Sequence, residues 1–319
     1  MGVIISIVTL THGLIAAVVF TASDPVELSG TQGKFDFIKV DPVNRRLLAC
    51  HTGNNSLDVI DLDSSKLIKS IVTGAAQGVA IDEKHSRYFV STSKPSKLVI
   101  IDSRKLESVS EMPLDDPADL VAYNAQSNRV LVCNDKKPVI WIIDPESKKV
   151  LATQTFPGGG MEDLSFDPEG KYLWQNLKDT SEVVKFDVSA DKIIDRYSTL
   201  PAEKPHGLAM VPELGALLVV GGTGKLTLLS LQNGKTLSSC DVAQKVDEIS
   251  YDPVMHQVYC ASGTGVISVV SVENNTLTNV SIIPSSLGAH SIAVDSKTHT
   301  VWIVFAKGTQ SFFQTFRSK

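Results

Sequence analysis

The sequence predicts an all-β fold: a seven-bladed β-propeller of four-stranded blades, with the ring closed by an N-terminal strand that joins the C-terminal blade. Three observations predict it. A short apolar strand that ends in Asp-Pro, or in a variant of it, occurs seven times. Successive copies are 41 to 44 residues apart, and each copy is followed by further short strand patterns separated by turns. No segment keeps a helical period of apolar residues over several turns.

Each copy has the same internal order. The first strand ends at an anchor residue, and the seven anchors are Asp41, Asp82, Asn124, Asp167, Val211, Asp252 and Asp295. Asp or Asn followed by Pro suits the start of a type I β-turn. A second apolar strand follows, as at 87–90, then a third that often ends in Ile-Asp, as at 99–102, and a more polar fourth, as at 67–71. This order is the pattern of a propeller blade.

The first strand also carries a packing pattern. The residues one and three places before each anchor are large and apolar, whereas the residue two places before is Ala or Ser in six copies. Successive side chains of a strand point to opposite faces, so each first strand has one large face and one small face. A ring of blades buries both if each large face packs on a neighbour's small face. Lys39 is the exception among the small residues, and the pattern gives no reason for it.

The two ends of the chain are predicted to complete the ring. The seventh copy supplies three strands, at 291–294, 301–305 and 311–316. Residues 24–30, just ahead of the first copy, have the place and length of the missing fourth strand. Closure of this kind removes the free sheet edges that would otherwise invite aggregation.

The first 22 residues are expected to be a signal peptide or a membrane anchor, and residues 23–319 the propeller. The apolar run 14–20 followed by small residues is typical of a secretory signal, although no Lys or Arg precedes it and His12 interrupts the apolar region. A misassigned start or an extra β segment is the alternative. Export implies a periplasmic or secreted protein. The membrane is expected to be contacted only through this segment, if it stays uncleaved.

Composition narrows the class of protein. The chain has 319 residues, 43% of them hydrophobic and 20% charged, which is typical of a globular protein. A net charge of −5 argues against a dedicated nucleic-acid binder, so no nucleic-acid partner is expected. Four cysteines are too few for a disulfide scaffold. Cys50, Cys133 and Cys260 lie in apolar runs, which favours buried thiols.

The repeats resemble the YncE-like, YVTN-repeat family of seven-bladed propellers. The first strands at 78–82 and 206–209 and the third-strand ends at 59–63 and 142–146 carry the resemblance, which spans roughly residues 24 to 319. It implies an exported bacterial protein without an assigned reaction. The wider neighbourhood includes lactonase-like enzymes and haem- or copper-bearing propellers. This chain lacks both the Cys-x-x-Cys-His haem motif and the dense histidines of a copper cluster, which speaks against a redox function.

One set of polar residues stands out, at the position five residues before each anchor. Six of the seven are Asp, Glu or His, and acidic residues follow directly in two copies. The candidate ligand-binding residues are Asp36, Gln77, Asp119, Glu162, Asp163, His206, Asp247, Glu248 and His290. Because the innermost strands of a propeller all start at one mouth of the central channel, these side chains are expected to converge there.

Two interpretations of this ring of residues stay open. In one, a divalent metal or a polar ligand is bound, and the candidate metal ligands are Asp36, Asp119, Glu162, His206, Asp247 and His290. In the other, polar side chains line a water-filled channel. The remaining histidines, His51, His85, His256 and His299, fall in turns or at strand ends and are expected at the surface. No cofactor beyond a divalent metal is indicated.

The function expected from these observations is a non-catalytic binding propeller of the bacterial cell envelope. Its channel mouth would take a small polar ligand, a metal or a loop of a protein partner, and the protein would be a monomer. One alternative is a metal-assisted hydrolase of the lactonase type, in which the metal polarises a carbonyl or activates water. The other is a protein-interaction scaffold that uses the blade rims. The fold alone does not choose among them, and no catalytic residues are assigned.

Overall fold

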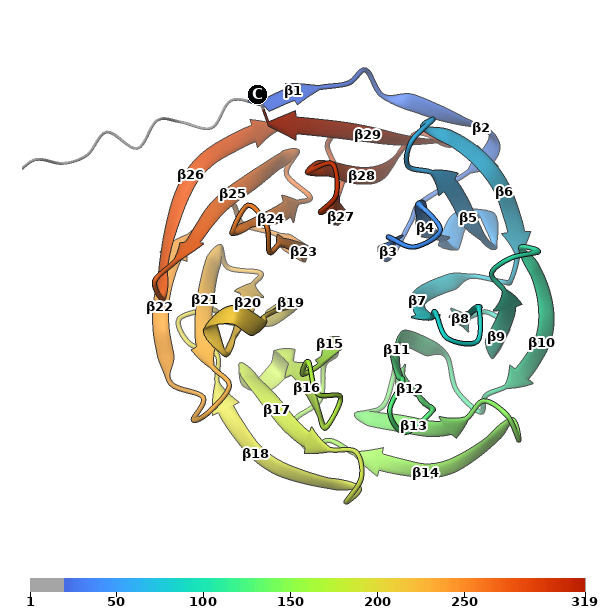
Figure 1. Cartoon of the computed structure of the whole chain (residues 1–319), viewed down its shortest axis with the longest axis horizontal. Coiled ribbons are helices and arrows are strands. Elements are labelled where there is room, and N and C mark those ends of the chain that lie inside the picture. Colours follow the sequence, from blue (N-terminus) through green and yellow to red (C-terminus); the bar gives the residue numbers. More distant parts are fainter. Residues whose placement is uncertain (1–19, 319) are drawn as a thin grey trace, which may run out of the picture.

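A computed structural model describes residues 20–318. Seven antiparallel sheets stand around a central axis like the blades of a propeller, in chain order around the ring (Figure 1). In each blade the first strand lies next to the axis and the fourth lies on the outside. The predicted fold class is therefore confirmed. In residues 20–318 no helix is long and apolar enough to cross a membrane.

The first three blades follow the predicted four-strand order. Blade 1 consists of β3 (Ile38–Asp41), β4 (Arg46–His51), β5 (Ser56–Asp61) and β6 (Lys66–Val72). Blade 2 consists of β7 (Ala76–Asp82), β8 (Arg87–Ser93), β9 (Ser96–Asp102) and β10 (Glu107–Pro113). Blade 3 consists of β11 (Ala118–Asn124), β12 (Arg129–Asn134), β13 (Val139–Asp144) and β14 (Lys149–Thr155).

The next three blades repeat the same order. Blade 4 consists of β15 (Met161–Phe166), β16 (Tyr172–Leu177), β17 (Glu182–Asp187) and β18 (Lys192–Ser198). Blade 5 consists of β19 (Pro205–Val211), β20 (Ala216–Gly221), β21 (Lys225–Ser230) and β22 (Thr236–Asp241). Blade 6 consists of β23 (Val246–Asp252), β24 (Gln257–Ser262), β25 (Val266–Glu273) and β26 (Thr276–Pro284). Three short 3-10 turns, η1 (Thr52–Asn54), η2 (Lys178–Thr180) and η3 (Pro212–Leu214), lie between strands.

Blade 7 joins both ends of the described chain. Its three C-terminal strands are β27 (Ser291–Asp295), β28 (Thr300–Lys307) and β29 (Gln310–Ser318). The outer edge of β29 pairs with β2 (Val26–Gln32), which confirms the predicted closing strand, and also with β1 (Phe20–Ala22). Residues 20–22 of the expected N-terminal segment thus form part of the closing blade. The rest of that segment lies outside the described residues.

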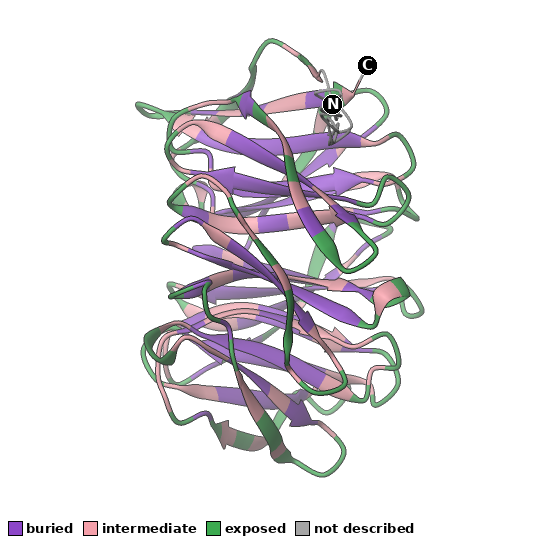
Figure 2. Cartoon of the chain, turned by 90° about the vertical axis from the view of Figure 1, so that its left-hand side faces the viewer, coloured by how far each residue is buried: buried purple, intermediate pink, exposed green. Residues whose placement is uncertain are grey.

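The packing of blade on blade follows the large and small faces predicted from the repeat. The buried apolar side chains fall into seven clusters, each shared by two neighbouring blades. Between blades 2 and 3, for example, the small Ala80 packs with Val121 and Tyr123. Figure 2 shows the buried residues concentrated in the strands and the exposed ones in the turns. The core is therefore a ring of seven interfaces around the channel.

The anchor residues close the turns at the mouth opposite the candidate site. Asp41 is buried, and its Oδ1 accepts the backbone N–H groups of Val43 and Asn44 at 3.1 and 2.9 Å. Asp295 makes a further bond across the seam of the ring. Arg45 of blade 1 donates to its Oδ1 and Oδ2 at 2.7 and 2.6 Å. This bidentate ion pair links the first blade to the last.

His51 is buried, so its expected surface position is wrong. Its Nδ1 lies 2.7 Å from Asp58 Oδ2, and its Nε2 lies 2.9 Å from the hydroxyl of Ser311 on β29. Its ring stacks on Phe35 with 3.9 Å between ring centroids. The reason is topological: β4 ends beside β29 and beside the segment that links β2 to β3, so a residue at that strand end is covered. His85, His256 and His299 are partly exposed, as predicted.

The cysteines agree with the sequence analysis. Cys50, Cys133 and Cys260 are buried and free, and Cys240 is free and half-buried. Burial raises the pKa of all four thiols, so at neutral pH they are protonated and behave as small apolar side chains.

Candidate functional site

The channel mouth at the start of the innermost strands opens into a cavity of about 570 Å³, which we call the outer chamber. This volume is in the range of small-molecule sites. The structure brings eight of the nine candidate residues to its wall: Asp36, Gln77, Asp119, Glu162, Asp163, His206, Asp247 and Glu248. The ninth, His290, lies behind Asp247, with its Nδ1 3.0 Å from Asp247 Oδ2. The shared position of these residues in the repeat thus indicates a shared location in the structure. The role of these residues in ligand binding stays a prediction.

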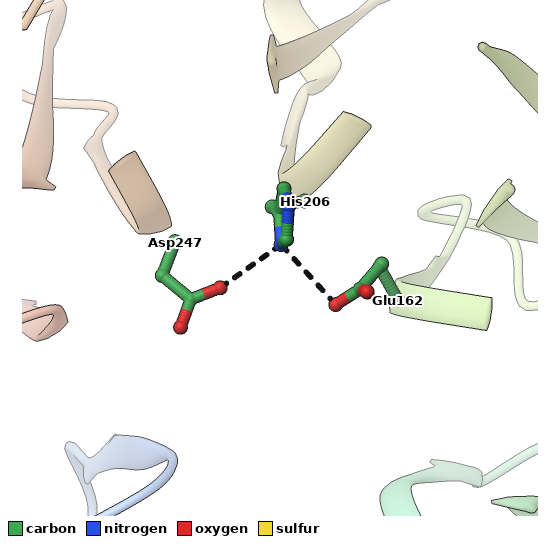
Figure 3. Close-up of side chains that lie close together, drawn as sticks. All are labelled: Glu162, His206 and Asp247. Atoms are coloured by element: carbon green, nitrogen blue, oxygen red, sulfur yellow. Dashed lines mark ion pairs between the residues drawn. The ribbon is translucent and has the colours of Figure 1, made fainter. Parts of the chain in front are cut away.

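The closest group in the chamber is Glu162, His206 and Asp247, from the first strands of three successive blades (Figure 3). His206 Nδ1 lies 3.1 Å from Asp247 Oδ1 and 3.3 Å from Glu162 Oε2. The imidazole nitrogen thus stands between two carboxylates and is aligned as a hydrogen-bond donor with neither. Lys178 forms an ion pair with the other oxygen of Glu162. We call these four residues the charged cluster.

A β-bulge explains why these side chains turn toward the channel. In blade 5 the pairing passes from Pro205–Gly221 to Leu208–Val219, so β19 has one residue more than β20 at this point. The same shift occurs in blades 3, 4 and 6, and a shorter form occurs in blade 2. An extra residue bends a strand and re-aims its side chains. The bulge coincides with the candidate position in all five blades.

Side chains of neighbouring strands hold the bulged backbone in place. Gln175 donates to the carbonyl oxygen of Glu162 at 2.6 Å, and Asn176 donates to that of His206 at 2.8 Å. The hydroxyl of Ser91 donates in the same way to the carbonyl oxygen of Asp119. These donors satisfy carbonyl groups that the bulge removes from the strand ladder. The candidate side chains therefore project from a fixed backbone.

The charges of the cluster reinforce one another. Contacts with Asp247 and Glu162 raise the pKa of His206 to about 9, so the imidazole is protonated at neutral pH. Burial raises the pKa of Asp247, but its contacts with His206 and His290 outweigh burial and hold it well below the usual range. The contact with Asp247 also raises the pKa of His290. The protonated His206 thus lies between the carboxylates of Glu162 and Asp247.

Other carboxyl groups of the chamber are held toward the neutral form. Burial, followed by the charge of Asp247, raises the pKa of Asp36 to about 6. Burial, followed by the charges of Asp36 and Glu162, raises the pKa of Asp119 well above its usual value. A protonated carboxyl donates a hydrogen bond as well as accepting one. Asp119 can therefore serve a ligand as a donor, whereas Asp36, with a pKa of about 6, is mainly an acceptor at neutral pH.

Asp163 and Glu248 have a different position from the other candidates. Asp163 Oδ2 accepts the backbone N–H of Leu208 in the next blade at 2.9 Å. Glu248 Oε2 accepts that of Ile292, again in the next blade, at 3.1 Å. Burial raises the pKa of both carboxyl groups, that of Asp163 to about 7. These two residues link neighbouring blades, in addition to lining the chamber.

The metal interpretation narrows to three of its six residues. One donor atom each from Glu162, His206 and Asp247 lies within 4.8 Å of the others, and carboxylate oxygen with imidazole nitrogen suits Zn²⁺ and similar ions. In residues 20–318 no such group includes Asp36, Asp119 or His290. A metal here would have to displace the proton of His206. The donor set fits a metal, although Lys178 already neutralises Glu162.

The sequence analysis missed several residues of the chamber wall. They follow the second strands of blades 3 and 4 or precede a first strand: Lys34, Asp135, Lys136, Lys137, Gly159, Gly160, Lys178 and Asp179. Gly160 has φ +55°, and a Cβ there would lie 2.9 Å from the Asp179 carboxyl group. These residues lie at strand ends that face the same mouth of the channel, and this position could have identified them. The sequence analysis considered the first strands alone and therefore missed them.

Comparisons with known proteins agree with the fold. No protein-family model matches the chain. YncE of Escherichia coli (strain K12) is 29% identical over 110 residues, which cover 34% of this chain and 30% of that protein. YncE of Salmonella typhi is 22% identical over 206 residues, covering 63% of this chain and 57% of that protein. This chain is a YncE-like seven-bladed β-propeller. It spans less than two thirds of these relatives, which are described as uncharacterized.

Solved structures place the YncE-like chain among propellers of diverse proteins. A chain of Kuenenia stuttgartiensis hydrazine synthase matches with a TM-score of 0.73 and 12% identity, over 87% of this chain and 96% of that one. The structure of U3-55K matches with a TM-score of 0.77 and 10% identity, over 92% and 98%. The RRP9 WD40 repeats match with a TM-score of 0.77 and 9% identity, over 93% and 98%. At these identities the likeness shows the fold alone.

Proposed function

We propose that this YncE-like propeller is a non-catalytic binding protein whose outer chamber takes a small polar ligand with both positive and negative groups. The observation that carries the proposal is the mixed charge of the chamber wall. It holds eight carboxyl groups, four lysines and the protonated His206. Opposite charges at fixed positions suit a dipolar ligand, because each group of the ligand meets a counter-charge that is already oriented.

The charged cluster would form one end of this site. Lys178 and His206 would receive a ligand carboxylate, and Asp247, whose side chain is 45% exposed, would receive an ammonium group. Asp36 and Asp119 would complete the hydrogen bonds as donors or acceptors. Because the residues come from separate blades on a rigid ring, little ordering energy would be lost on binding.

A metal-assisted hydrolase is the second candidate. One observation favours it, the approach of the donor atoms of Glu162, His206 and Asp247 to within 4.8 Å. These residues would hold the metal, and the metal would supply a polarised carbonyl or an activated water. Asp36 and Asp119 stand in the same chamber and could exchange protons with a bound lactone.

A variant of the charged cluster and a matched control make the test specific. The double variant Glu162→Gln/His206→Ala removes the centre of the charged cluster. The control Glu213→Gln/His256→Ala removes a similar pair at the opposite mouth, where His256 Nδ1 lies 3.3 Å from Glu213 Oε1. Each protein is titrated calorimetrically with L-glutamate, L-lysine and glycylglycine, and separately with Ca²⁺, Mg²⁺ and Zn²⁺.

The two candidates give different results. A dipolar probe that binds the wild type and the control but not the cluster variant supports the binding function. The hydrolase is supported if Zn²⁺ binds the wild type and the control but not the cluster variant, and if the Zn²⁺-loaded wild type hydrolyses a lactone. Absence of saturable heat with every probe and metal would overturn both and leave a water-filled channel.

We also propose that the protein is an exported monomer of the bacterial cell envelope, either periplasmic or secreted. The apolar run 14–20 supports export. The mass of protein recovered from a periplasmic fraction would test it, and recovery from the cytoplasm with Met1 in place would contradict it. A protein-interaction role on the blade rims is the third function class. The WD40 propellers that share the fold support a capacity for protein contacts and name no partner for this chain.

A further inference from the structure

Strand β16 of blade 4 carries two buried amide side chains at positions where no other blade has one. Gln175 lies eight residues after the anchor Asp167, and the equivalent residues of the other six blades are apolar: Ala49, Val90, Val132, Val219, Cys260 and Ile303. Asn176 comes next, and its equivalents are small or apolar: Cys50, Ser91, Cys133, Val220, Ala261 and Val304. Both amide side chains are fully buried. The pair therefore breaks the repeat in blade 4 alone.

The fold itself does not require these amides. A polar atom that is buried without a partner is costly, and Asn176 Oδ1 has no hydrogen-bond partner in residues 20–318. The other six blades form their sheets with apolar or small residues at the same two positions. A residue that breaks a repeat at such a cost is expected where a functional site needs it. The contacts of the two amides show which site that is.

Gln175 holds the backbone of Glu162. Its Nε2 donates to the carbonyl oxygen of Glu162 at 2.6 Å and to that of Asp163 at 3.4 Å. Its Oε1 accepts the thiol of the buried Cys133, in blade 3, at 3.3 Å. Because the thiol is a donor and the carbonyl oxygens are acceptors, the orientation of the amide is determined. Glu162 is thus held by a side chain that is itself held from the neighbouring blade.

Asn176 holds the backbone of His206 in the next blade. Its Nδ2 donates to the carbonyl oxygen of His206 at 2.8 Å and to that of Gly207 at 3.3 Å. Ser91 makes the equivalent contact from the same repeat position of blade 2, where it donates to the carbonyl oxygen of Asp119 in blade 3. Since Gln175 and Asn176 are consecutive, a single strand fixes the backbone of both Glu162 and His206.

His206 Nδ1 lies 3.3 Å from Glu162 Oε2, and the two residues belong to different sheets, so no strand ladder sets this separation (Figure 3). We propose that Gln175 and Asn176 are positioning residues of the outer chamber, which hold Glu162 and His206 at the separation that a ligand requires. The proposal rests on the binding function proposed above for that chamber. Neither amide lines the chamber wall, so both act through the residues that they hold. A misplacement of about 1 Å is enough to weaken a site severely.

The test replaces each amide by valine, which three other blades have at the first position and two at the second, so Gln175→Val and Asn176→Val are expected to fold. Asn176→Ser is the conservative variant, because Ser91 donates from the same repeat position. Val90→Ala is the control. It removes buried methyl groups at the Gln175 position of blade 2 and leaves both amides in place. Gln175→Met keeps the length of the side chain without the donor and repeats the test if a valine variant does not fold.

Crystal structures of the ligand-free proteins measure the separation of His206 Nδ1 and Glu162 Oε2, and calorimetric titration with L-glutamate and glycylglycine measures binding. In each valine variant a carbonyl group loses its donor and has to find another partner, which moves the backbone. The separation should therefore change by about 1 Å or more, and the affinity should fall about tenfold to a hundredfold. Asn176→Ser and Val90→Ala should keep both the separation and the affinity of the wild type.

The two readouts separate this proposal from the binding function. An unchanged separation in both valine variants would overturn the positioning role, and so would an equal loss of affinity in Val90→Ala. If neither probe binds the wild type but the valine variants displace His206 or Glu162, the binding function is wrong, whereas the positioning of the two side chains is still supported.

Discussion

Replacing Arg45 by Met should destabilise the ring at its seam. The guanidinium of Arg45 holds both oxygens of Asp295 at 2.7 and 2.6 Å, and the Asp295 side chain is only 2% exposed. Without Arg45 this carboxylate keeps one hydroxyl and one backbone donor, from Thr298 and Lys297. Charged hydrogen bonds contribute about 1.5–3 kcal/mol, and removing one partner of a buried pair costs about 3–5 kcal/mol. Since Arg45 is itself 14% exposed, we expect a loss of about 2–4 kcal/mol.

Urea unfolding followed by tryptophan fluorescence measures this loss. Arg104→Met is the control, because Arg104 is an exposed turn arginine whose side chain forms no ion pair with residues 20–318. The control should stay within about 0.5 kcal/mol of the wild type. If Arg45→Met also stays within that margin, the seam pair does not hold the ring together and the reasoning is wrong.

The pH dependence gives an independent check of the same pair. Burial raises the pKa of Asp295, but its bonds with Arg45 outweigh burial and lower it below its usual value. A carboxyl group with a lowered pKa in the folded state contributes stability above its unfolded pKa, about 4, and loses it as the pH falls through the folded value. The difference in stability between wild type and Arg45→Met should therefore be full at pH 6 and shrink below about pH 4.

Three further predictions concern stability. Ala122→Phe should cost about 1–3 kcal/mol by overpacking the interface of blades 3 and 4, whereas Glu169→Phe in an exposed turn should change the unfolding free energy little. His51→Ala should cost about 3–5 kcal/mol, because it leaves the buried Asp58 with the Ser56 hydroxyl as its one remaining side-chain partner in residues 20–318; a variant that unfolds at the same urea concentration as wild type would argue against the buried arrangement. A chain that begins at Ser23 lacks β1 and should melt at a lower temperature than one that begins at residue 20, and equal melting temperatures would show that β1 adds nothing to the closing blade.

The fold could be predicted because the sequence repeats with a regular period. Seven copies of one strand pattern indicate seven blades, and the alternation of large and small residues within that strand indicates which face packs on a neighbouring blade. Ala80 and Ala122 are small for that reason, and both lie where the pattern places them. The convergence of Asp119, Glu162 and His206 follows from the same period, because equivalent residues of a ring lie at equivalent distances from its axis.

The remaining features depend on contacts between blades, which the period does not specify. A strand-end histidine such as His51 looks exposed until the closing strands are placed over it. Asp163 resembles its neighbour Glu162 in sequence, yet the bulge directs it to a backbone N–H of the next blade.

Closure by both ends also bears on how the chain folds. Six blades are built from strands that are neighbours in sequence, so they need only short loops to form. The seventh needs β2 and β29 to meet, and Gln310 and Glu27, which bond at 3.0 Å, are 283 residues apart. Bringing such distant segments together has a large entropic cost and forms contacts slowly. Blade 7 should therefore be the last to form, only after β29 has been synthesised. A circular permutant that joins residue 318 to residue 20 and opens a turn between two other blades would make this closure local, and should fold faster into the same ring.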